Sequence, residues 1–392
     1  MKARSYESLI LLPGREKPVL QRHHWIFSGA VKTFPQVEDG SLVEVRDHQG
    51  NHLGYAYVNR RCSIVARMVS FGPELPEKAL ETSLERAIRL RQVLFGPETN
   101  AYRLVNGEGD NLPGLVVDRY NEIVVIQITT LGMEKLKAWL LERLIHRLRP
   151  CSILERSLGP ARQEEGLEDY EAWIYGEAHF TTEIKEDQAK YVVDFTHPQK
   201  TGFYLDQKEM RKLVRQLAAG RKVLDCFAYT GAFSVNALLG GARKAELVEA
   251  SPHSLGVAQR NLEMNGFGPE FYRLHNEDVF SFLRQPKIEA DFIILDPPAF
   301  AKKKSDVIAA CRGYKDINRL AMRHLPPGGL LLTFSCSHHV DDSLFQKVLF
   351  EAACEAGRQV KILQRMRHSL DHPLNIFHPE SHYLKGFLLY VD

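Results

Sequence analysis

The stretch KVLDCFAYTGAFS, residues 222–234, decides the fold of this chain. Its first half is an apolar strand candidate that ends in Asp225, and its second half turns through Thr230 and Gly231 into a helical pattern. Gly231 lets the backbone come close to a ligand, and the N–H groups at a helix start donate hydrogen bonds. The stretch lacks the G-x-G-x-x-G pattern, so it disfavours a dehydrogenase. Asp225 suits a ligand with an ammonium or hydroxyl group better than a phosphate.

Strand-like and helix-like stretches continue to alternate to the end of the chain. The strand candidates are KVLDCF, KAELVEAS, FYRLHN, ADFIILDPP and GGLLLTFSC. Such alternation predicts a doubly wound, largely parallel α/β sheet, which we assign to residues 189–392. Ligands of these sheets bind beyond the carboxyl ends of the strands.

Residues 1–72 follow a different pattern. The alternating stretch SLVEVRDHQGNHLGYAYVN, residues 41–59, predicts a small β-barrel. Residues 1–72 hold ten Lys or Arg against six Asp or Glu, whereas the net charge of the whole chain is only +2. Arg22, His24 and Trp25 suit phosphate contacts and stacking on a base, and the alternative is that Trp25 fills the barrel. We therefore expect a basic RNA-binding module at this end.

Residues 73–188 connect these two parts. After the linker-like FGPELPEK, helical and strand patterns alternate without recognisable chemistry, which predicts a small α+β domain. The chain holds no apolar run near the ~20 residues of a membrane span. Its six cysteines form no C-x-x-C pair and indicate reduced thiols, so we expect a cytoplasmic protein without a membrane partner.

Acidic residues stand at successive strand ends of the predicted sheet. Asp225, Glu249 and Asp278 in register indicate an adenosine ligand with a positively charged, amino-acid-like tail, and thus S-adenosylmethionine. We expect the cofactor to contact these and the neighbouring residues Asp206, Gln207, Asp225, Phe227, Thr230, Gly231, Glu249, Asp278 and Asp296. Asp206 could instead cap the helix that follows it.

The stretch DPPAFAKKKS, residues 296–305, closes the fourth strand. Its two prolines stiffen the turn, which holds Asp296 and Phe300 over the crevice. A rigid aromatic edge suits a flipped-out base, and the lysines that follow suit RNA phosphates. The RNA contacts expected here are Phe300, Lys302, Lys303, Lys304, Tyr314 and Lys315.

Cys336 in TFSCSHHV, residues 333–340, has three interpretations: a zinc ligand, a nucleophile or a core residue. Adjacent histidines on an extended segment point in opposite directions and no second ligand cluster is evident, so we expect no metal site. Cys226 and Cys311 are rival nucleophiles, for which packing is the favoured interpretation.

Several motifs together resemble one family. They are TGFYLDQ, VLDCFAYTGAFSV, DPPAFAKKKS, CRGYKDIN, LTFSCSHH, HPESHYLKGF and the early HHWIFSGAV. Over essentially the whole chain they resemble the RlmI family of bacterial ribosomal RNA cytosine-C5 methyltransferases. The resemblance implies an N-terminal PUA β-barrel, a small central domain and a Rossmann-like class I S-adenosylmethionine-dependent methyltransferase domain. It also implies methylation of carbon 5 of a cytosine in 23S rRNA, typically cytosine 1962, with Cys336 as the nucleophile.

The chemistry explains why a thiol is needed. Addition of a thiolate to C6 makes C5 of cytosine electron-rich enough to accept a methyl group, and His338 or His339 could take the thiol proton. Asp296 is the candidate for holding the cytosine edge, while the base that removes the C5 proton stays unassigned. Two alternatives remain: an exocyclic-amine RNA methyltransferase acting on guanine or adenine, and a non-catalytic RNA-binding ribosome assembly factor. The substrate form, large subunit or precursor, and the oligomeric state, a homodimer included, stay open.

Overall fold

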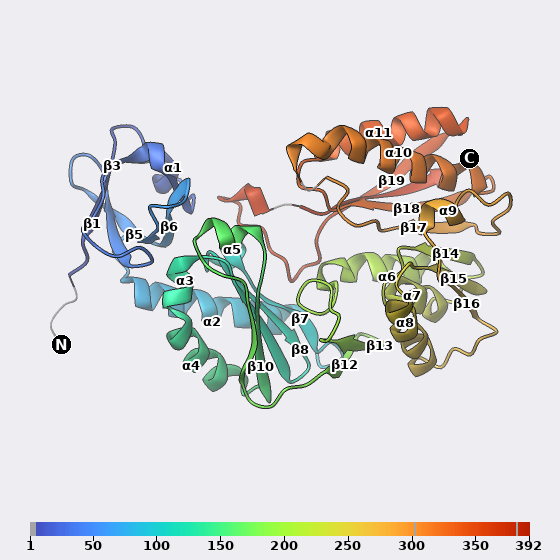
Figure 1. Ribbon diagram of the computed structural model, residues 1–392, viewed down its shortest axis with the longest axis horizontal. Coiled ribbons are helices and arrows are strands. Elements are labelled where there is room, and N and C mark those ends of the chain that lie inside the picture. Colours follow the sequence, from blue (N-terminus) through green and yellow to red (C-terminus); the bar gives the residue numbers. More distant parts are fainter. Residues whose placement is uncertain (1–4, 302, 382) are drawn as a thin grey trace. The chain divides into compact units, whose positions relative to one another are not determined.

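The computed structural model describes residues 5–301, 303–381 and 383–392, and it forms two compact units (Figure 1). Unit 1 comprises Met1–Ile184, Val193–Asp206 and Leu370–His382, and unit 2 comprises Lys185–Val192, Gln207–Ser369 and Tyr383–Asp392. The division into three domains at residues 72 and 188 stays a prediction. Among the described residues, no helix is long and apolar enough to cross a membrane.

The N-terminal sheet of unit 1 has six strands in the order β2-β6-β5-β4-β1-β3. Alternate residues of β4 and of its neighbour β1, such as Val43 and Val45, are buried in an apolar core, as the period-two pattern predicted for β4. Gly54 has a φ of +147°, and a Cβ there would lie 2.1 Å from the Ser70 carbonyl oxygen, so the close pairing of two strands requires glycine. The elements are β1 (Ser8–Leu11), α1 (Lys17–Leu20), β2 (Trp25–Phe27), β3 (Val31–Thr33), β4 (Leu42–Arg46), β5 (His52–Val58) and β6 (Ile64–Phe71).

A second sheet of unit 1 has five strands in the order β11-β10-β9-β8-β7. Leu80 and Leu84 of α2 and Leu140 and Leu144 of α4 pack with its strands into one apolar core. The elements are α2 (Pro76–Leu94), β7 (Ala101–Asn106), β8 (Leu115–Tyr120), β9 (Ile123–Ile128), α3 (Leu131–Lys135), α4 (Lys137–Leu148), β10 (Ser152–Ser157), α5 (Pro160–Glu164) and β11 (Tyr170–Tyr175). A two-stranded sheet of β12 (Thr181–Glu186) and β13 (Ala189–Asp194) follows in sequence.

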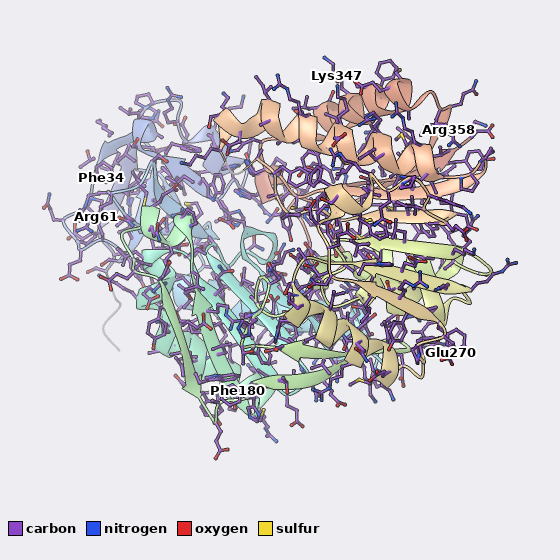
Figure 2. All side chains as sticks on the ribbon, turned by 45° about the vertical axis from the view of Figure 1, so that its right-hand side comes forward. Phe34, Arg61, Phe180, Glu270, Lys347 and Arg358 are labelled. Atoms are coloured by element: carbon purple, nitrogen blue, oxygen red, sulfur yellow. The ribbon has the colours of Figure 1, made fainter. Side chains whose placement is uncertain are left out.

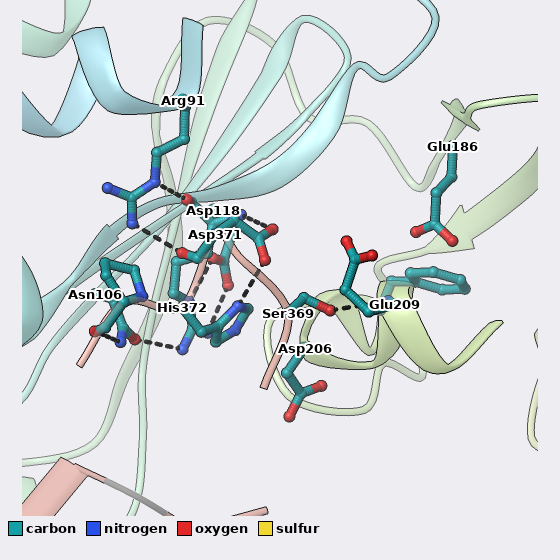
Figure 3. A network of polar contacts seen from close by, with 12 residues as sticks. Arg91, Asn106, Asp118, Glu186, Asp206, Glu209, Ser369, Asp371 and His372 are labelled. Atoms are coloured by element: carbon teal, nitrogen blue, oxygen red, sulfur yellow. Dashed lines mark hydrogen bonds and ion pairs between the residues drawn. The ribbon is translucent and has the colours of Figure 1, made fainter. Parts of the chain in front are cut away.

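The late segment Leu370–His382 belongs to unit 1, although it lies between two strands of unit 2 in sequence. Arg91 is fully buried and binds both oxygens of Asp110, at 2.6 and 2.8 Å. It also donates to the Asp371 carbonyl at 2.8 Å (Figure 3). Asn106 donates to the Pro373 carbonyl at 3.0 Å. The charge-assisted bond from Arg91 fixes the segment to α2, and the amide bond from Asn106 fixes it to β7 of the five-stranded sheet.

Unit 2 contains a seven-stranded sheet in the order β16-β15-β14-β17-β18-β20-β19. The first five strands in this order are mutually parallel, whereas β20 runs antiparallel to both β18 and β19. The strands are β14 (Lys222–Cys226), β15 (Lys244–Val248), β16 (Tyr272–His275), β17 (Phe292–Leu295), β18 (Gly329–Ser335), β19 (Val360–Met366) and β20 (Lys385–Val391). The predicted doubly wound sheet is therefore confirmed, with an antiparallel edge hairpin added.

Helices cover the strands of unit 2 according to the alternation of their side chains. Leu224 and Cys226 of β14 pack in the core shared with α9, α10 and α11, whereas Asp225 between them bonds Ser234 of α7. On α11, Phe345 and Val348 are buried while Lys347 points outward (Figure 2). The helices are α6 (Lys208–Leu217), α7 (Ala232–Leu239), α8 (Pro252–Met264), α9 (Val279–Phe282), α10 (Val307–His324) and α11 (Asp342–Ala356).

Candidate active site

The loop between β14 and α7 has an unusual backbone. Phe227, Tyr229 and Gly231 have φ values of 60°, 48° and 73°, in the left-handed region that non-glycine residues rarely adopt. A Cβ at Gly231 would lie 3.0 Å from both the Ala258 Cβ and the Leu247 Cδ2. The loop is thus held in a tight, pre-formed shape at the carboxyl end of the central strand, where parallel sheets bind ligands.

Asp225, which precedes this loop, is a buried carboxyl group with incomplete partners. Its Oδ2 accepts hydrogen bonds from the Ser234 backbone N–H at 3.1 Å and the Ser234 hydroxyl at 2.8 Å. Its Oδ1 is buried without a hydrogen-bond partner among the described residues. Burial is the main cause that raises the pKa of Asp225 to about 7; the neighbouring Asp296 and Glu249 carboxylates act in the same direction, and the Ser234 hydrogen bonds act against them. A cationic or hydroxyl group of a ligand would satisfy the free oxygen.

Acids follow the next two strands at the same edge of the sheet. Glu249, after β15, accepts from the backbone N–H of Tyr229 at 3.0 Å and of Ser251 at 2.9 Å, which ties it to the β14 loop. Asp278, after β16, accepts from the Ser281 N–H at 3.0 Å and caps α9. Because β14, β15 and β16 are adjacent and parallel, the three acids stand at or just beyond the same edge of the sheet, and their contact with a cofactor stays a prediction.

Thr230 and Gln207 complete the residues that suit an S-adenosylmethionine site. The Thr230 hydroxyl is buried without a hydrogen-bond partner among the described residues, so, like Asp225 Oδ1, it is available to a ligand. Gln207 at the start of α6 donates from Nε2 to Asp296 Oδ2 at 2.7 Å. Asp206 belongs to unit 1, where it pairs with Lys200 Nζ at 2.5 Å. The donors and acceptors present in unit 2 therefore fit an adenosine with an ammonium-bearing tail.

Cys336 directly follows β18, two strands from the Asp225 strand in the sheet order. It is half-buried, and its Sγ lies 3.7 Å from the Pro297 carbonyl oxygen in the turn after β17. The two rival thiols are less suited to attack a substrate. Burial raises the pKa of Cys226 well above its usual value, and burial also raises the pKa of Cys311. Cys226, at the end of β14, is also close to the DPP turn but is fully buried, whereas Cys336 at the end of β18 is half-buried.

The backbone after Cys336 is held by groups from three other elements. The Ser337 hydroxyl accepts from the Ala301 N–H at 3.0 Å and lies 2.9 Å from the Tyr314 hydroxyl of α10. The Ser337 carbonyl accepts from Lys385 Nζ of β20 at 2.8 Å. All these contacts involve the serine that follows the thiol, so the thiol's own orientation depends on them.

Lys385 is a functional candidate that the sequence reasoning missed. It lies opposite Ser335 in the β18–β20 register and is only 3% exposed. Burial lowers the pKa of Lys385, while Asp342 and Cys336 act in the opposite direction. An ammonium group near Cys336 stabilises a thiolate there. The available signal was a lysine that interrupts the apolar strand LKGFLLYV, because a buried lysine requires a specific partner.

Two family models match this chain. One describes S-adenosylmethionine-dependent methyltransferases and matches residues 163–376, and the other describes a PUA-like domain and matches residues 9–71. Ribosomal RNA large subunit methyltransferase I from Klebsiella pneumoniae strain 342 is 39% identical over 97% of this chain and 98% of its own length. The protein of that name from Escherichia coli strain SMS-3-5 is 40% identical over 97% and 98%. The chain belongs to the RlmI family.

Solved structures support the same fold. A Streptococcus mutans protein assigned as an S-adenosylmethionine-dependent methyltransferase covers 98% of this chain and 100% of its own, with a TM-score of 0.81 and 23% identity. A second such structure, complexed with SAH, covers the same shares with a TM-score of 0.82 and 23% identity. The predicted RlmI-family fold, with a PUA-like barrel and a Rossmann-like methyltransferase domain, is confirmed, and so is S-adenosylmethionine as the cofactor.

The RNA contacts predicted in the barrel differ in their exposure. Arg22 is exposed, has a φ of 62°, and its guanidinium lies 5.7 Å from the centre of the Phe377 ring. Trp25 is half-buried and donates from Nε1 to Glu108 at 2.8 Å. His24 is fully buried, and burial lowers its pKa to about 4. A neutral, buried His24 does not offer a side chain to RNA, so its role in this RlmI-family chain is to support the barrel.

The RNA contacts predicted in the methyltransferase part also differ in their exposure. Phe300 is half-buried with its ring centre 4.6 Å from that of Tyr314, while Lys303 and Lys304 are exposed. Tyr314 is fully buried and Lys315 pairs with Glu355 of α11 at 2.6 Å. Tyr314 therefore holds Ser337 and Phe300 in place and presents no surface to RNA. The predicted Lys302 lies outside the described residues.

Proposed function

We propose that this protein transfers a methyl group to carbon 5 of a cytosine in 23S rRNA, family-typically cytosine 1962, through a covalent bond between Cys336 and C6. The observation that carries the proposal is the position of Cys336. Its thiol stands at the end of β18, beside the DPP turn and close to the buried Lys385. The name of the curated relatives, ribosomal RNA large subunit methyltransferase I, supports the large-subunit RNA as the substrate.

Each residue of the site has a role in this proposal. Asp225, Thr230, Glu249 and Asp278, with Phe227, Gly231 and Gln207 around them, bind and orient S-adenosylmethionine, which supplies the methyl group when bound. Lys385 favours the thiolate of Cys336. Asp296, held by Gln207, accepts from the exocyclic amine of the cytosine and places C6 against the thiolate.

In the proposed reaction, each bond that forms on the cytosine is matched by a bond that breaks. The Cys336 thiolate adds to C6, and the electron pair of the C5–C6 double bond makes C5 nucleophilic. C5 then takes the methyl group that bound S-adenosylmethionine would supply, with S-adenosylhomocysteine as the leaving group. A base removes the C5 proton, and the returning electron pair restores the C5–C6 double bond and expels the thiolate. The covalent step is needed because C5 of cytosine is itself a poor nucleophile. The exposed Arg22, Lys303 and Lys304, with the half-buried Trp25 and Phe300, are the residues we propose for contact with RNA. We propose that the protein meets this substrate in the cytoplasm.

The test uses labelled S-adenosylmethionine and 23S rRNA, followed by digestion of the RNA to nucleosides. Wild type should yield labelled 5-methylcytidine and Cys336→Ala should yield none, while both bind the cofactor equally in calorimetry. A label on an exocyclic amine of guanine or adenine would overturn the proposal in favour of the amine methyltransferase. Absence of both methyl transfer and cofactor binding would favour a non-catalytic assembly factor.

A further inference from the structure

Two histidines and a glutamate from distant parts of the sequence meet in unit 1. His23 precedes β2 of the barrel, and His378 and Glu380 lie in the late segment Leu370–His382. One nitrogen or oxygen from each of the three side chains lies within 4.8 Å of the others. Imidazole and carboxylate are the ligands that zinc accepts most readily besides thiolate.

The spacing of these atoms matches a metal site. His23 Nε2 lies 3.2 Å from Glu380 Oε1, and His378 Nδ1 lies 3.7 Å from Glu380 Oε2. Two ligand atoms at about 2.05 Å from a tetrahedral zinc ion are separated by about 3.3 Å. Small rotations of the side chains would therefore bring the three ligands to one ion without backbone movement.

His378 supplies an independent indication of a missing ligand. Its side chain is fully buried, and neither ring nitrogen has a hydrogen-bond partner among the described residues. Its ring centre lies 4.5 Å from the Trp25 ring and 4.8 Å from the His23 ring. A buried polar group without a partner costs free energy, so such groups are normally satisfied by protein, water or an ion.

The surroundings of His23 allow it to coordinate through Nε2. Its other nitrogen, Nδ1, accepts a hydrogen bond from the Trp25 backbone N–H at 3.2 Å and lies 3.4 Å from the Trp25 carbonyl oxygen. Metal binding at Nε2 would use the other tautomer, in which the proton moves to Nδ1 and is donated to that carbonyl. Histidine ligands of metals usually donate their second nitrogen to a carbonyl or carboxylate in this way.

We propose that His23, His378 and Glu380 bind one divalent transition-metal ion, Zn²⁺, with water in the fourth position. The site would join the barrel to the late segment that Arg91 and Asn106 already anchor to α2 and β7. The chain continues from this segment into β20, which carries Lys385. The proposal departs from the expectation of no metal site, because the three ligands become neighbours only through the fold. It is independent of the proposed methyltransferase reaction.

The test is metal binding by the full-length protein after removal of any affinity tag and of bound metal with a chelator. Zn²⁺ is titrated in competition with a chromophoric indicator, and Co²⁺ reports the geometry through its visible absorption. The wild type should bind one equivalent of Zn²⁺ and give the intense Co²⁺ bands of four-coordination. Glu380→Gln should weaken binding by at least about 10- to 100-fold, the scale already seen for loss of an outer partner.

The matched control is Glu44→Gln, which breaks another histidine–glutamate pair of the same barrel, since Glu44 Oε1 lies 2.6 Å from His52 Nδ1. This variant should bind Zn²⁺ as the wild type does. Circular dichroism and a melting curve for each variant would show that both are folded. No stoichiometric Zn²⁺ binding by the wild type, or equal binding by Glu380→Gln, would overturn the proposal.

Discussion

The carboxyl ends of β14 and β18 lie at the same edge of one sheet but are held in different ways. At the end of β14, Asp225 bonds Ser234 and Glu249 bonds Tyr229, while Asn261 of α8 donates to the Thr230 carbonyl. The groups that shape the loop thus come from one continuous stretch of chain, from β14 to α8. After β18, the position of Ser337 depends on Ala301, Tyr314 and Lys385, which come from three separate elements. The cofactor side is thus nearly self-contained, whereas the thiol side depends on the wider fold.

This difference predicts that binding and chemistry are separable. Changes at the β18 end should lower the rate of methyl transfer and leave the affinity for S-adenosylmethionine intact. Changes at the β14 end should weaken the affinity for S-adenosylmethionine and leave the rate of methyl transfer nearly intact when the cofactor is saturating. The predictions that follow test this separation, beginning with the largest expected effect.

Cys336→Ala should lower the single-turnover rate of methyl transfer by at least about 10⁴-fold, because removal of a covalent nucleophile leaves only binding and orientation. Its Kd for S-adenosylmethionine, measured by calorimetry, should equal that of the wild type. Cys311→Ala, on α10, serves as the matched control and should keep the full rate. A Cys336→Ala protein with a rate within tenfold of the wild type would end the nucleophile assignment.

Asp225→Asn should weaken S-adenosylmethionine binding by about 10- to 100-fold, since a charged hydrogen bond contributes about 1.5–3 kcal/mol. With saturating cofactor, the rate of methyl transfer should stay within a few-fold of the wild type. Calorimetry and single-turnover kinetics on the same samples give both quantities. Unchanged affinity would show that the free Oδ1 of Asp225 does not meet the cofactor.

The stability of the cofactor-free protein should depend on pH through the same carboxyl group of Asp225. The pKa of Asp225 rises from 3.8 to about 7 on folding, so between these values the folded chain holds a proton that the unfolded chain releases. Stability should therefore fall as pH rises through this window. Asp225→Asn lacks this term, so its Tm relative to that of the wild type should increase from pH 4 to pH 7. A constant difference in Tm across this range would contradict the shifted pKa.

Lys385→Met should lower the rate at pH 7 by about tenfold, the effect of losing about 1.4 kcal/mol of thiolate stabilisation. The loss should shrink at higher pH, where the thiolate forms without help, and this pH profile separates an electrostatic role from a purely structural one. The control is Lys361→Met on the neighbouring strand β19, because Lys361 is exposed and lies over the Tyr390 ring. A pH-independent loss would assign Lys385 to packing alone.

Tyr314→Phe should give the smallest effect. It removes the hydroxyl that lies 2.9 Å from Ser337 Oγ and should cost about 1 kcal/mol of stability. The rate should fall only a few-fold, with the affinity for S-adenosylmethionine unchanged. Urea unfolding together with single-turnover kinetics would check both values. A large loss of cofactor affinity in this variant would contradict the separation of the two strand ends.

The difference between the β14 and β18 strand ends also explains how much of the site could be predicted from the sequence. The shared location of Asp225, Glu249 and Asp278 could be predicted because each acid lies at or shortly after the end of a strand, and parallel strands end at one edge. The position of Cys336 at a strand end was readable for the same reason. The antiparallel β20 and its Lys385 were missed, because strand pairing over long sequence separation leaves no local pattern. For RNA contacts, His24 and Tyr314 were misjudged because their burial is set by the tertiary fold.

No pattern in the sequence indicates that His23 lies close to His378 and Glu380. His378 and Glu380 of HPESHYLKGF lie within residues 189–392, which the sequence pattern assigns to the C-terminal sheet domain. The structure counts them in unit 1, beside residues more than three hundred positions earlier in the chain. Ligand sets assembled from distant segments are a property of the fold and leave no spacing rule to read.

The most direct test of the central claim is to trap the covalent bond between Cys336 and the cytosine. A 23S rRNA fragment containing 5-fluorocytidine is incubated with the protein and S-adenosylmethionine, then analysed on a denaturing gel. After methyl transfer, fluorine at C5 leaves no proton to remove, so the thiol cannot be expelled and the complex should persist. The wild type should give a methylated protein–RNA band that Cys336→Ala lacks. A wild type that makes 5-methylcytidine without trapping, or a Cys336→Ala protein that still traps RNA, would contradict the account.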